Sequence, residues 1–210
     1  MKYGILGTGM VGEALAKHLA SKGHEVMIGS RTGKMIDVAN AKFGTFDETA
    51  KFGEVLFNCT MGLISVDALK VIGRDRLKNK ILIDVANPLD FSKGMPPTLS
   101  VSNTDSLGEQ LQREFPEAKV VKAFNTVNCA VMVNPNSVPG DHHLFICGND
   151  DNAKKSVLNI LVEDFGWKAK NIFDLGDITN SRATESLLPL WIRLWGKLGT
   201  ASFNFKIVSS

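Results

Sequence analysis

The amino-acid sequence predicts an α/β fold built on a doubly wound, mostly parallel sheet, with a small C-terminal α/β lobe that ends in a long helix. In the first half, short β-branched runs alternate with segments of helical periodicity, which is typical of βαβ units. The strand-like runs are almost continuously apolar, as expected when helices cover both faces of a sheet. The 210 residues, 44% apolar and 22% charged, suffice for one domain with a small appendage.

In the first half, expected strands alternate with expected helices. Lys2–Leu6 is predicted as a strand, and residues 10–22 as a helix because their apolar side chains recur at three- and four-residue spacing. Residues 87–104 are rich in Pro, Ser and Asn and should form a long loop. Further strands are expected at residues 24–28, 55–57 and 80–85, and helices at residues 34–42 and 64–72.

The second half continues with longer helices. Residues 125–140 contain Pro135 and Pro139 and should be mostly irregular. Asp151 is expected to cap a helix that Gly166 ends. The expected helices are residues 105–115, 151–165 and 180–198, and the expected strands are residues 118–124, 143–147 and 172–175.

Residues 7–12 read Gly-Thr-Gly-Met-Val-Gly, a G-x-G-x-x-G pattern between the first expected strand and helix. Gly7 permits the tight turn, Gly9 lets the backbone approach a pyrophosphate, and Gly12 allows close packing of helix against strand. The N–H groups at the start of the helix would then point at the phosphates, where the helix dipole favours negative charge. This turn predicts a dinucleotide site on a Rossmann-type fold.

The end of the second expected strand indicates which dinucleotide binds. NAD-binding proteins place an Asp or Glu there for the ribose hydroxyls, whereas residues 29–34 of this chain read Gly-Ser-Arg-Thr-Gly-Lys. The hydroxyls of Ser30 and Thr32 suit a 2′-phosphate, as do the charges of Arg31 and Lys34. The alternative is a solvated basic loop without a ligand. We therefore expect NADP(H) rather than NAD.

Three further strands end in short polar segments, and the carboxyl ends of parallel strands meet at one edge of the sheet. Thr60 and Met61 follow one strand, Asn87 follows the next, and Ala123 and Asn125 follow a third. Each segment alone is typical of an ordinary strand end, but their shared edge favours a site for the nicotinamide ring. We expect residues 1–145 to form the NADP-binding domain and residues 146–210 a lobe that completes the substrate cleft.

Residues for the familiar dehydrogenase and metal chemistries are missing. Tyr3 is the only tyrosine, so no Tyr-x-x-x-Lys pair exists, and the adjacent His142 and His143 would point to opposite faces of a strand. We predict no metal site, leave the catalytic residues unassigned, and assign no role to Arg182 or the two histidines. Such a site is compatible with hydride transfer between a nicotinamide and a flavin-like ring, which depends chiefly on stacking geometry.

Four segments resemble the coenzyme F420-dependent NADP oxidoreductase family, and together they span nearly the whole chain. They read GILGTGMVGEALA (residues 4–16), HEVMIGSR (24–31), VVKAFNT (120–126) and TNSRATESLLPLW (179–191). The resemblance implies a Rossmann-like body, a small C-terminal lobe, and a cleft between them for hydride transfer between NADPH and the deazaflavin F420. The residues that it implies for NADP binding are Thr8, Gly9, Met10, Val11, Ser30, Arg31 and Lys34.

A second resemblance supplies an alternative function. VVKAFNTVNCA, with the preceding SNTDSLGEQL, is similar to the cytosolic NADPH-binding domain of the six-transmembrane metalloreductases. This similarity implies an NADPH-dependent flavin or ferric reductase. A non-catalytic NADPH-sensing module is an alternative of another class. A pyrroline-carboxylate or hydroxyacid reductase is disfavoured, because those enzymes append a much longer helical domain.

Composition and charge narrow the expected partners to a small-molecule redox acceptor. A net charge of +2 and a pI near 8.4 give no reason to expect nucleic acid. No run approaches the roughly 18 apolar residues of a membrane helix. Cys59, Cys129 and Cys147 are dispersed and odd in number, which predicts reduced thiols and a cytoplasmic location.

The last expected helix carries a broad apolar face from Leu187 to Leu198, and Pro189 should kink or start it. This face either packs onto its own lobe or forms the seam of a homodimer. Trp191 and Trp195, at i and i+4, are residues of the kind that anchor interfaces.

Overall fold

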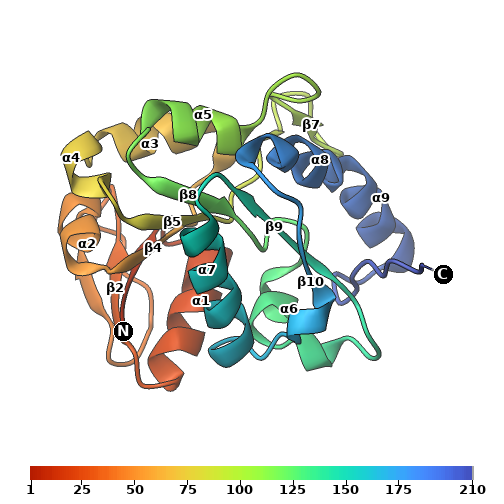
Figure 1. The fold of residues 1–210 in the computed structure, drawn as a ribbon, viewed down its shortest axis with the longest axis horizontal. Coiled ribbons are helices and arrows are strands. Elements are labelled where there is room, and N and C mark those ends of the chain that lie inside the picture. The colour runs from red at the N-terminus through yellow and green to blue at the C-terminus, as the bar shows by residue number, and fades with distance from the viewer. Residues whose placement is uncertain (210) are drawn as a thin grey trace.

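A computed structural model describes residues 1–209, in which eight strands form one sheet with helices packed on both faces (Figure 1). The strand order is β10-β9-β8-β5-β4-β1-β2-β3. All neighbouring pairs in this sheet are parallel except β8 and β9. The doubly wound, mostly parallel fold predicted from the sequence is therefore confirmed.

The elements alternate along the chain as βαβ units require. The strands of the main sheet are β1 (Lys2–Leu6), β2 (Glu25–Gly29), β3 (Lys42–Gly44), β4 (Val55–Asn58), β5 (Ile81–Asp84), β8 (Lys119–Lys122), β9 (Leu144–Gly148) and β10 (Ile172–Asp174). A separate antiparallel pair consists of β6 (Leu89–Asp90) and β7 (Thr98–Leu99). The helices are α1 (Met10–Ser21), α2 (Phe46–Phe52), α3 (Ser65–Lys70), α4 (Arg74–Leu77), α5 (Leu107–Glu114), α6 (Cys129–Val133), α7 (Asp151–Glu163), α8 (Ser181–Ser186) and α9 (Leu188–Leu198).

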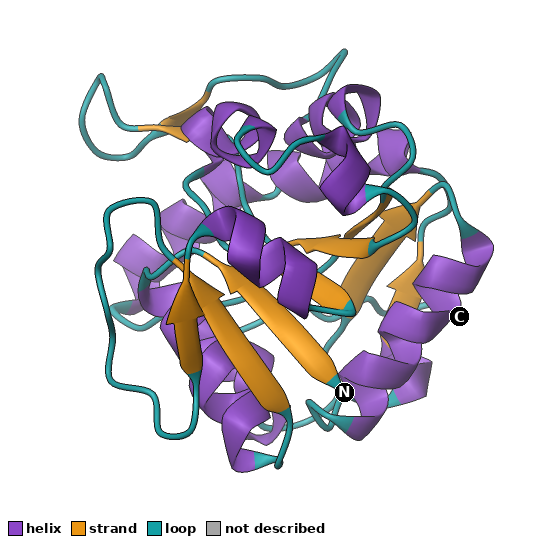
Figure 2. Cartoon of the chain, turned by 90° about the vertical axis from the view of Figure 1, so that its left-hand side faces the viewer, coloured by secondary structure: helices purple, strands orange, loops and turns teal. Residues whose placement is uncertain are grey.

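Two hydrophobic cores lie on the two faces of the sheet. Helices α1, α6 and α7 cover one face, where Leu15 and Phe165 pack with Tyr3 of β1. Helices α2 to α5 cover the other face, where Leu111 packs with Leu56 of β4. Figure 2 shows the twisted strands between these helical layers. Because successive strand residues enter opposite cores, the strands are apolar throughout, as expected.

The strand order places a crevice beside β1. From β1 the sheet extends through β2 to β3 in one direction and through β4 and β5 to β8 in the other. In this topology the loops that follow β1 and β4 diverge, and ligands bind in the resulting crevice at the carboxyl ends of the strands. The glycine turn and Thr60 lie in these two loops, so the fold brings them to one place.

The helix predicted at residues 34–42 is wrong, because this segment is a loop that leads into β3. Lys34, Met35 and Asp37 are exposed, and only Val38 is buried. Ile36, Val38 and Ala41 pack against the core, but their spacings of two and three residues do not place them on one helical face. Asn40 takes a left-handed φ of 63°, which also interrupts a helix.

The prediction missed α2, although its start signal is present in the sequence. The Thr45 side chain accepts from the Glu48 N–H at 3.2 Å, while a Glu48 carboxylate oxygen accepts from the Thr45 N–H at 2.7 Å. This reciprocal pair is a capping box, which satisfies donors that the first helical turn leaves free.

Other differences are smaller. Asp150 caps α7, accepting from the Ala153 N–H at 2.8 Å, whereas Asp151 was expected to be the cap. The loop predicted at residues 87–104 contains the short pair β6 and β7, and the irregular segment at 125–140 contains α6. The helix predicted at residues 180–198 is divided into α8 and α9 at Leu187, just before Pro189. Among the described helices, none is long and apolar enough to cross a membrane.

Candidate functional site

A groove of about 220 Å³ lies in the crevice between the loops after β1, β2 and β4. Its walls come from three segments that the sequence singled out, together with residues that it did not. The lining residues are Gly7, Thr8, Gly9, Gly29, Ser30, Arg31, Thr32, Phe46, Cys59, Thr60, Met61 and Ile64.

Two glycines of the turn are required by the protein's own packing. Gly7 has a φ of 126°, and a Cβ there would lie 2.6 Å from the Cys59 carbonyl oxygen. A Cβ at Gly12 would lie 2.2 Å from the Gly7 carbonyl oxygen. These approaches bring helix α1 close to β1 and leave its N-terminus at the groove.

Gly9 differs, because nothing in the protein lies within 4 Å of the position of its missing Cβ. It is the N-cap of α1, with a φ of −82° that any residue can adopt, and it offers no side chain to cap the helix. The first N–H groups of α1 are therefore left for an external acceptor, and the helix dipole favours an anion there. This surface fits a pyrophosphate, as expected from the sequence.

The basic segment predicted to bind the 2′-phosphate lies at one end of the groove. Ser30 is held by its N–H, which donates to the Gly44 carbonyl of β3 at 2.9 Å. Arg31 and Thr32 are exposed and line the groove. Within residues 1–209, Arg31 forms no ion pair, so its guanidinium is available to an anion. Lys34 lies further along the same exposed loop and does not line the groove.

On the opposite wall, Thr60 belongs to a polar network at the end of β4. Its hydroxyl donates to Asn58 Oδ1 at 2.7 Å and lies 2.8 Å from the Ser65 hydroxyl. Asn58 and Ser65 are fully buried, so they fix the position of the Thr60 side chain. The neighbouring Cys59 is not an activated nucleophile, because burial raises the pKa of its thiol.

The ends of β5 and β8 carry a pair of amides that bond to each other. Asn87 Nδ2 donates to the Asn125 carbonyl oxygen at 2.8 Å, and Asn125 Nδ2 donates to Asn87 Oδ1 at 3.0 Å. Asn125 is 3% exposed, and its Oδ1 has no hydrogen-bond partner among the described residues. A buried acceptor without a donor costs about 1–3 kcal/mol, so this amide pair is kept at the expense of stability.

The chain between β8 and Asn125 takes an unusual conformation. Phe124 is fully buried with a left-handed φ of 65°, and its ring packs on Phe165 at a centroid distance of 5.0 Å. Such a conformation costs about 1–2 kcal/mol for an L-residue and persists where packing over-determines it. Ala123 is also fully buried, so its side chain lies in the core rather than at a ligand surface.

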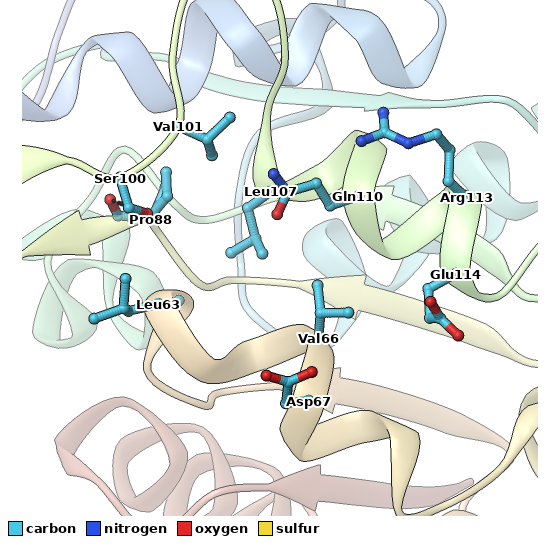
Figure 3. Close-up of a pocket in the computed structure, with 11 residues that line it drawn as sticks. Leu63, Val66, Asp67, Pro88, Ser100, Val101, Leu107, Gln110, Arg113 and Glu114 are labelled. Atoms are coloured by element: carbon cyan, nitrogen blue, oxygen red, sulfur yellow. Dashed lines mark hydrogen bonds between the residues drawn. The ribbon is translucent and has the colours of Figure 1, made fainter.

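A second hollow of about 460 Å³ lies between α3 and α5 (Figure 3). Leu63, Val66 and Leu107 project toward it, and Asp67 and Glu114 lie along its border. Arg113, also at its border, is held by Asp105 through two hydrogen bonds of 2.8 Å. The charged groups along this hollow are paired with one another, with Asp67 bound to Lys70 and Glu114 to Arg74, so among the described residues it offers no free cation to a phosphate.

Most of the predicted site residues lie near one another, but only some of them line the groove. The glycine-turn residues Gly7 to Gly9, the segment Ser30 to Thr32, and Thr60 with Met61 share the groove. Met10, Val11 and Lys34 are outside its lining, and Met10 is 82% exposed. Asn87, Ala123 and Asn125 lie at the carboxyl ends of β5 and β8.

Sequence reasoning missed the groove residue Phe46 and the buried lysine behind the strand ends. The capping box of α2 could have placed Phe46 as the first residue of a helix facing β2. Lys122 is a charged residue between the apolar pairs Val120-Val121 and Ala123-Phe124, which signals a buried ion pair without identifying its partners.

The site offers no metal or nucleophile chemistry of its own. In the part of the chain that the structure describes, no three His, Cys, Asp or Glu side chains are arranged to hold a metal ion. The features present are the free N–H groups at the start of α1 and an exposed basic segment at one end of the groove, both of which suit a phosphorylated ligand.

Comparisons with known proteins agree with this geometry. Residues 2–88 match the family model described as NADP oxidoreductase, coenzyme F420-dependent. The F420-dependent NADP reductase of Methanocaldococcus jannaschii is 32% identical, over 92% of each chain. A crystal structure of a proposed F420-dependent NADP reductase from Arthrobacter sp. FB24 covers 100% of both chains, with 49% identity and a TM-score of 0.94.

One further relative differs in size. The metalloreductase STEAP3 of Rattus norvegicus is 30% identical over 90% of this chain, but the match covers only 38% of STEAP3. The similarity is therefore confined to one part of that larger protein.

Proposed function

Because the chain belongs to the family of F420-dependent NADP oxidoreductases, we propose that it transfers a hydride between NADPH and the deazaflavin F420. The observation that carries this proposal is the combination of Gly9, whose Cβ position is open, with the basic segment at Ser30 to Thr32. The first suits a pyrophosphate and the second a 2′-phosphate, which distinguishes NADP(H) from NAD(H).

The groove residues have distinct roles in this proposal. The N–H groups at the start of α1, including those of Met10 and Val11, bind the pyrophosphate beside Gly9. Arg31 binds the 2′-phosphate with the hydroxyls of Ser30 and Thr32, and Lys34 adds positive charge from the adjoining loop. Gly7, Thr8, Thr60 and Met61 line the path from this end of the groove toward the strand ends.

At the strand ends, the nicotinamide ring lies beside Asn125. Its partner Asn87 holds the Asn125 side chain in place, and the backbone at Ala123 and Phe124 fixes its distance from β5. NADPH would supply a hydride to F420, and the proton that balances the reduced product would come from solvent, so the protein has chiefly to orient two stacked rings. For this reason the mechanism requires no side chain to act as a general acid.

Residues 146–210 are proposed to complete the acceptor side of the cleft. The predicted boundary after residue 145 lies within β9, so this segment continues the main sheet before it forms α8 and α9. An NADPH-dependent flavin or ferric reductase is the second candidate, favoured by the similarity to part of STEAP3.

We also propose a cytoplasmic location and a homodimer. Cys59, Cys129 and Cys147 are all free thiols, which suits a reducing compartment. The exposed part of α9 supports the dimer, because Leu190 is 50% and Leu198 54% exposed on one short helix.

The test is NADPH oxidation with F420, FMN, FAD and a ferric chelate supplied separately. We expect turnover with F420 and little or none with the others. Turnover only with flavin, with or without iron, would favour the second candidate. Tight NADPH binding without turnover on any acceptor would contradict both and favour an NADPH sensor.

A further inference from the structure

A buried lysine lies directly behind the strand ends of the proposed site. Lys122 is the last residue of β8, and its ammonium donates to Asp84 Oδ2 at 2.7 Å and to the Ala86 carbonyl at 2.6 Å. It also lies 2.7 Å from Glu185 Oε1. The side chains of all three charged residues are at most 2% exposed. We call Lys122, Asp84 and Glu185 the charge clamp.

Through Asp84 the clamp reaches both walls of the site. Asp84 Oδ1 accepts from the Ala86 N–H at 3.2 Å, next to Asn87, and from Asn58 Nδ2 at 2.8 Å. Asn58 in turn accepts from the Thr60 hydroxyl in the groove. Lys122 therefore holds the Ala86 carbonyl directly, and it reaches the Thr60 side chain through three successive hydrogen bonds by way of Asp84 and Asn58.

Through Glu185 the clamp reaches the C-terminal helices. Glu185, on α8, accepts from the Leu107 N–H at 2.9 Å and from the Gly108 N–H at 3.1 Å, both at the start of α5. The hydroxyls of Ser106 and Ser181 lie 2.7 Å apart beside these contacts. One carboxylate thus attaches the helices of residues 146–210 to the end of β8.

We infer that the charge clamp is a set of positioning residues for hydride transfer, which holds the nicotinamide side and the acceptor side of the cleft in one arrangement. This inference rests on the proposed function. The clamp residues have almost no exposed surface and so do not touch either substrate. A buried ion cluster is also a poor source of stability, since apolar residues of similar volume often serve as well or better. Its value is geometric, because three charged groups with fixed partners permit few alternative arrangements.

Lys154 supplies a matched control. It is a buried lysine that pairs with Asp174 at 2.9 Å and donates to the Gly176 carbonyl at 3.2 Å. Asp174 ends β10, which runs parallel to β9 and opposite in direction to β8. Because β9 separates β10 from β8, Lys154 forms its ion pair two strands away from Lys122 and shares no partner with it among the described residues. Its partner Asp174 is 45% exposed, so Lys154→Met removes a buried lysine without disturbing the clamp.

The experiment compares Glu185→Gln, the double variant Lys122→Met with Glu185→Gln, and Lys154→Met with the wild type. Glu185→Gln keeps the side-chain volume and one acceptor oxygen, so folding is expected. The double variant removes one positive and one negative charge together and avoids two carboxylates without a cation. For each protein we would measure the midpoint of thermal unfolding, the Kd of NADPH, kcat with F420, and hydrogen exchange of the free protein.

We expect Glu185→Gln to lower kcat about 10–100-fold, the usual effect of misplacing reacting groups, while the Kd of NADPH changes less than about threefold. Amide exchange at residues 107–108 should become at least about tenfold faster, because both N–H groups lose a charged acceptor. Exchange at residues 86–87 should become faster in the double variant, which removes the ammonium that binds the Ala86 carbonyl and Asp84. Lys154→Met should lower the unfolding midpoint but leave kcat and these amides near wild type.

The inference is overturned if folded Glu185→Gln and the double variant keep kcat within about threefold of wild type, since misplaced groups cost more than that. It is equally overturned if Lys154→Met lowers kcat as much, or if exchange at residues 86–87 and 107–108 does not change. If the wild type oxidises no NADPH with any acceptor, the proposed function fails, and the exchange data alone then decide whether the clamp orders the strand ends.

Discussion

Gly9 and Gly12 belong to the same short turn, but the surrounding protein constrains them differently. A Cβ at Gly12 would collide with the backbone of Gly7, whereas a Cβ at Gly9 would meet nothing within 4 Å. We expect Gly12→Ala to lower the free energy of unfolding by about 1–3 kcal/mol, a typical cost of overpacking. We expect Gly9→Ala to change it by less than about 1 kcal/mol and still to weaken NADPH binding more than tenfold.

Thermal unfolding and NADPH titration of both variants check this contrast. A structural role for Gly9 would follow if Gly9→Ala unfolded the protein. If Gly9→Ala bound NADPH as tightly as wild type, Gly9 would not lie at the pyrophosphate.

Arg31 is the residue that should separate NADPH from NADH. It is exposed and free of ion pairs within residues 1–209, so its removal disturbs no packing. We expect Arg31→Ala to weaken NADPH binding by about 1.5–3 kcal/mol, the value of a hydrogen bond to a charged group, with little effect on NADH. Fluorescence titration with each dinucleotide measures the difference, and an equal loss for both would exclude a 2′-phosphate contact at Arg31.

Residues of the site differed in how far the sequence could predict them. The glycine turn and the Ser30 to Thr32 segment were predictable, because local spacing alone carries their chemistry. The unpaired Oδ1 of Asn125 was not, since it depends on a hydrogen bond between side chains in the loops that follow two different strands. Lys122 and Glu185 meet only after α8 has folded onto the sheet, and no local pattern encodes that contact.

Among the elements, the C-terminal tail after α9 is held by two buried histidines. His143 Nδ1 accepts from the Ile207 N–H at 2.8 Å, and Asn204 Nδ2 donates to His142 Nδ1 at 2.8 Å. Both contacts require a ring nitrogen without a proton. The ring of Phe203 in the same tail stacks on Trp191 of α9 at a centroid distance of 5.1 Å. The tail is therefore held both by the two histidines and by α9.

The pKa of His143 is lowered from 6.5, chiefly by burial, with His142 and Lys206 contributing and Asp141 opposing. Because the folded-state pKa lies below the unfolded value, the unfolded chain binds more protons between the two. The stabilisation is therefore complete above pH 6.5 and is lost as the pH falls through the folded-state pKa. We expect the tail to detach under acidic conditions, with faster chymotrypsin cleavage at Phe203.

His143→Asn provides the control, because an Asn oxygen can accept from the Ile207 N–H but does not titrate. The rate of chymotrypsin cleavage of this variant should be nearly the same at acidic and at neutral pH, after correction for the protease's own pH dependence. A wild-type tail that is equally resistant at acidic and neutral pH would contradict the assignment.

Elements with a strong periodic pattern were predicted, and those defined by tertiary contact were not. The apolar runs of the main strands and the long helices α1, α5 and α7 follow from their own residues. Residues 34–42 have helix-compatible residues, but those that contact the core do not recur at helical spacing, so the segment forms a loop. The strand β3 pairs with β2 only because the sheet already exists, and its three residues carry no pattern of their own.

At the scale of the whole molecule, an exposed apolar patch lies on and beside α9. Trp195 is 43%, Leu198 54% and Met95 64% exposed, and Trp195 and Met95 line one shallow hollow. We expect a homodimer in solution that buries this patch, and Trp195→Glu should convert it to a monomer. Light scattering after gel filtration measures both masses, and a monomeric wild type would refute the proposed dimer.

The central claim is that a hydride passes directly from NADPH to F420 in the cleft at the strand ends. The most direct measurement uses NADPH that carries deuterium at both positions of nicotinamide C4, followed by mass spectrometry of the reduced F420. We predict one deuterium in the product, because the accepting position of a deazaflavin is carbon and does not exchange with water. Reduced F420 without deuterium, or no reduction of F420 at all, would contradict this account.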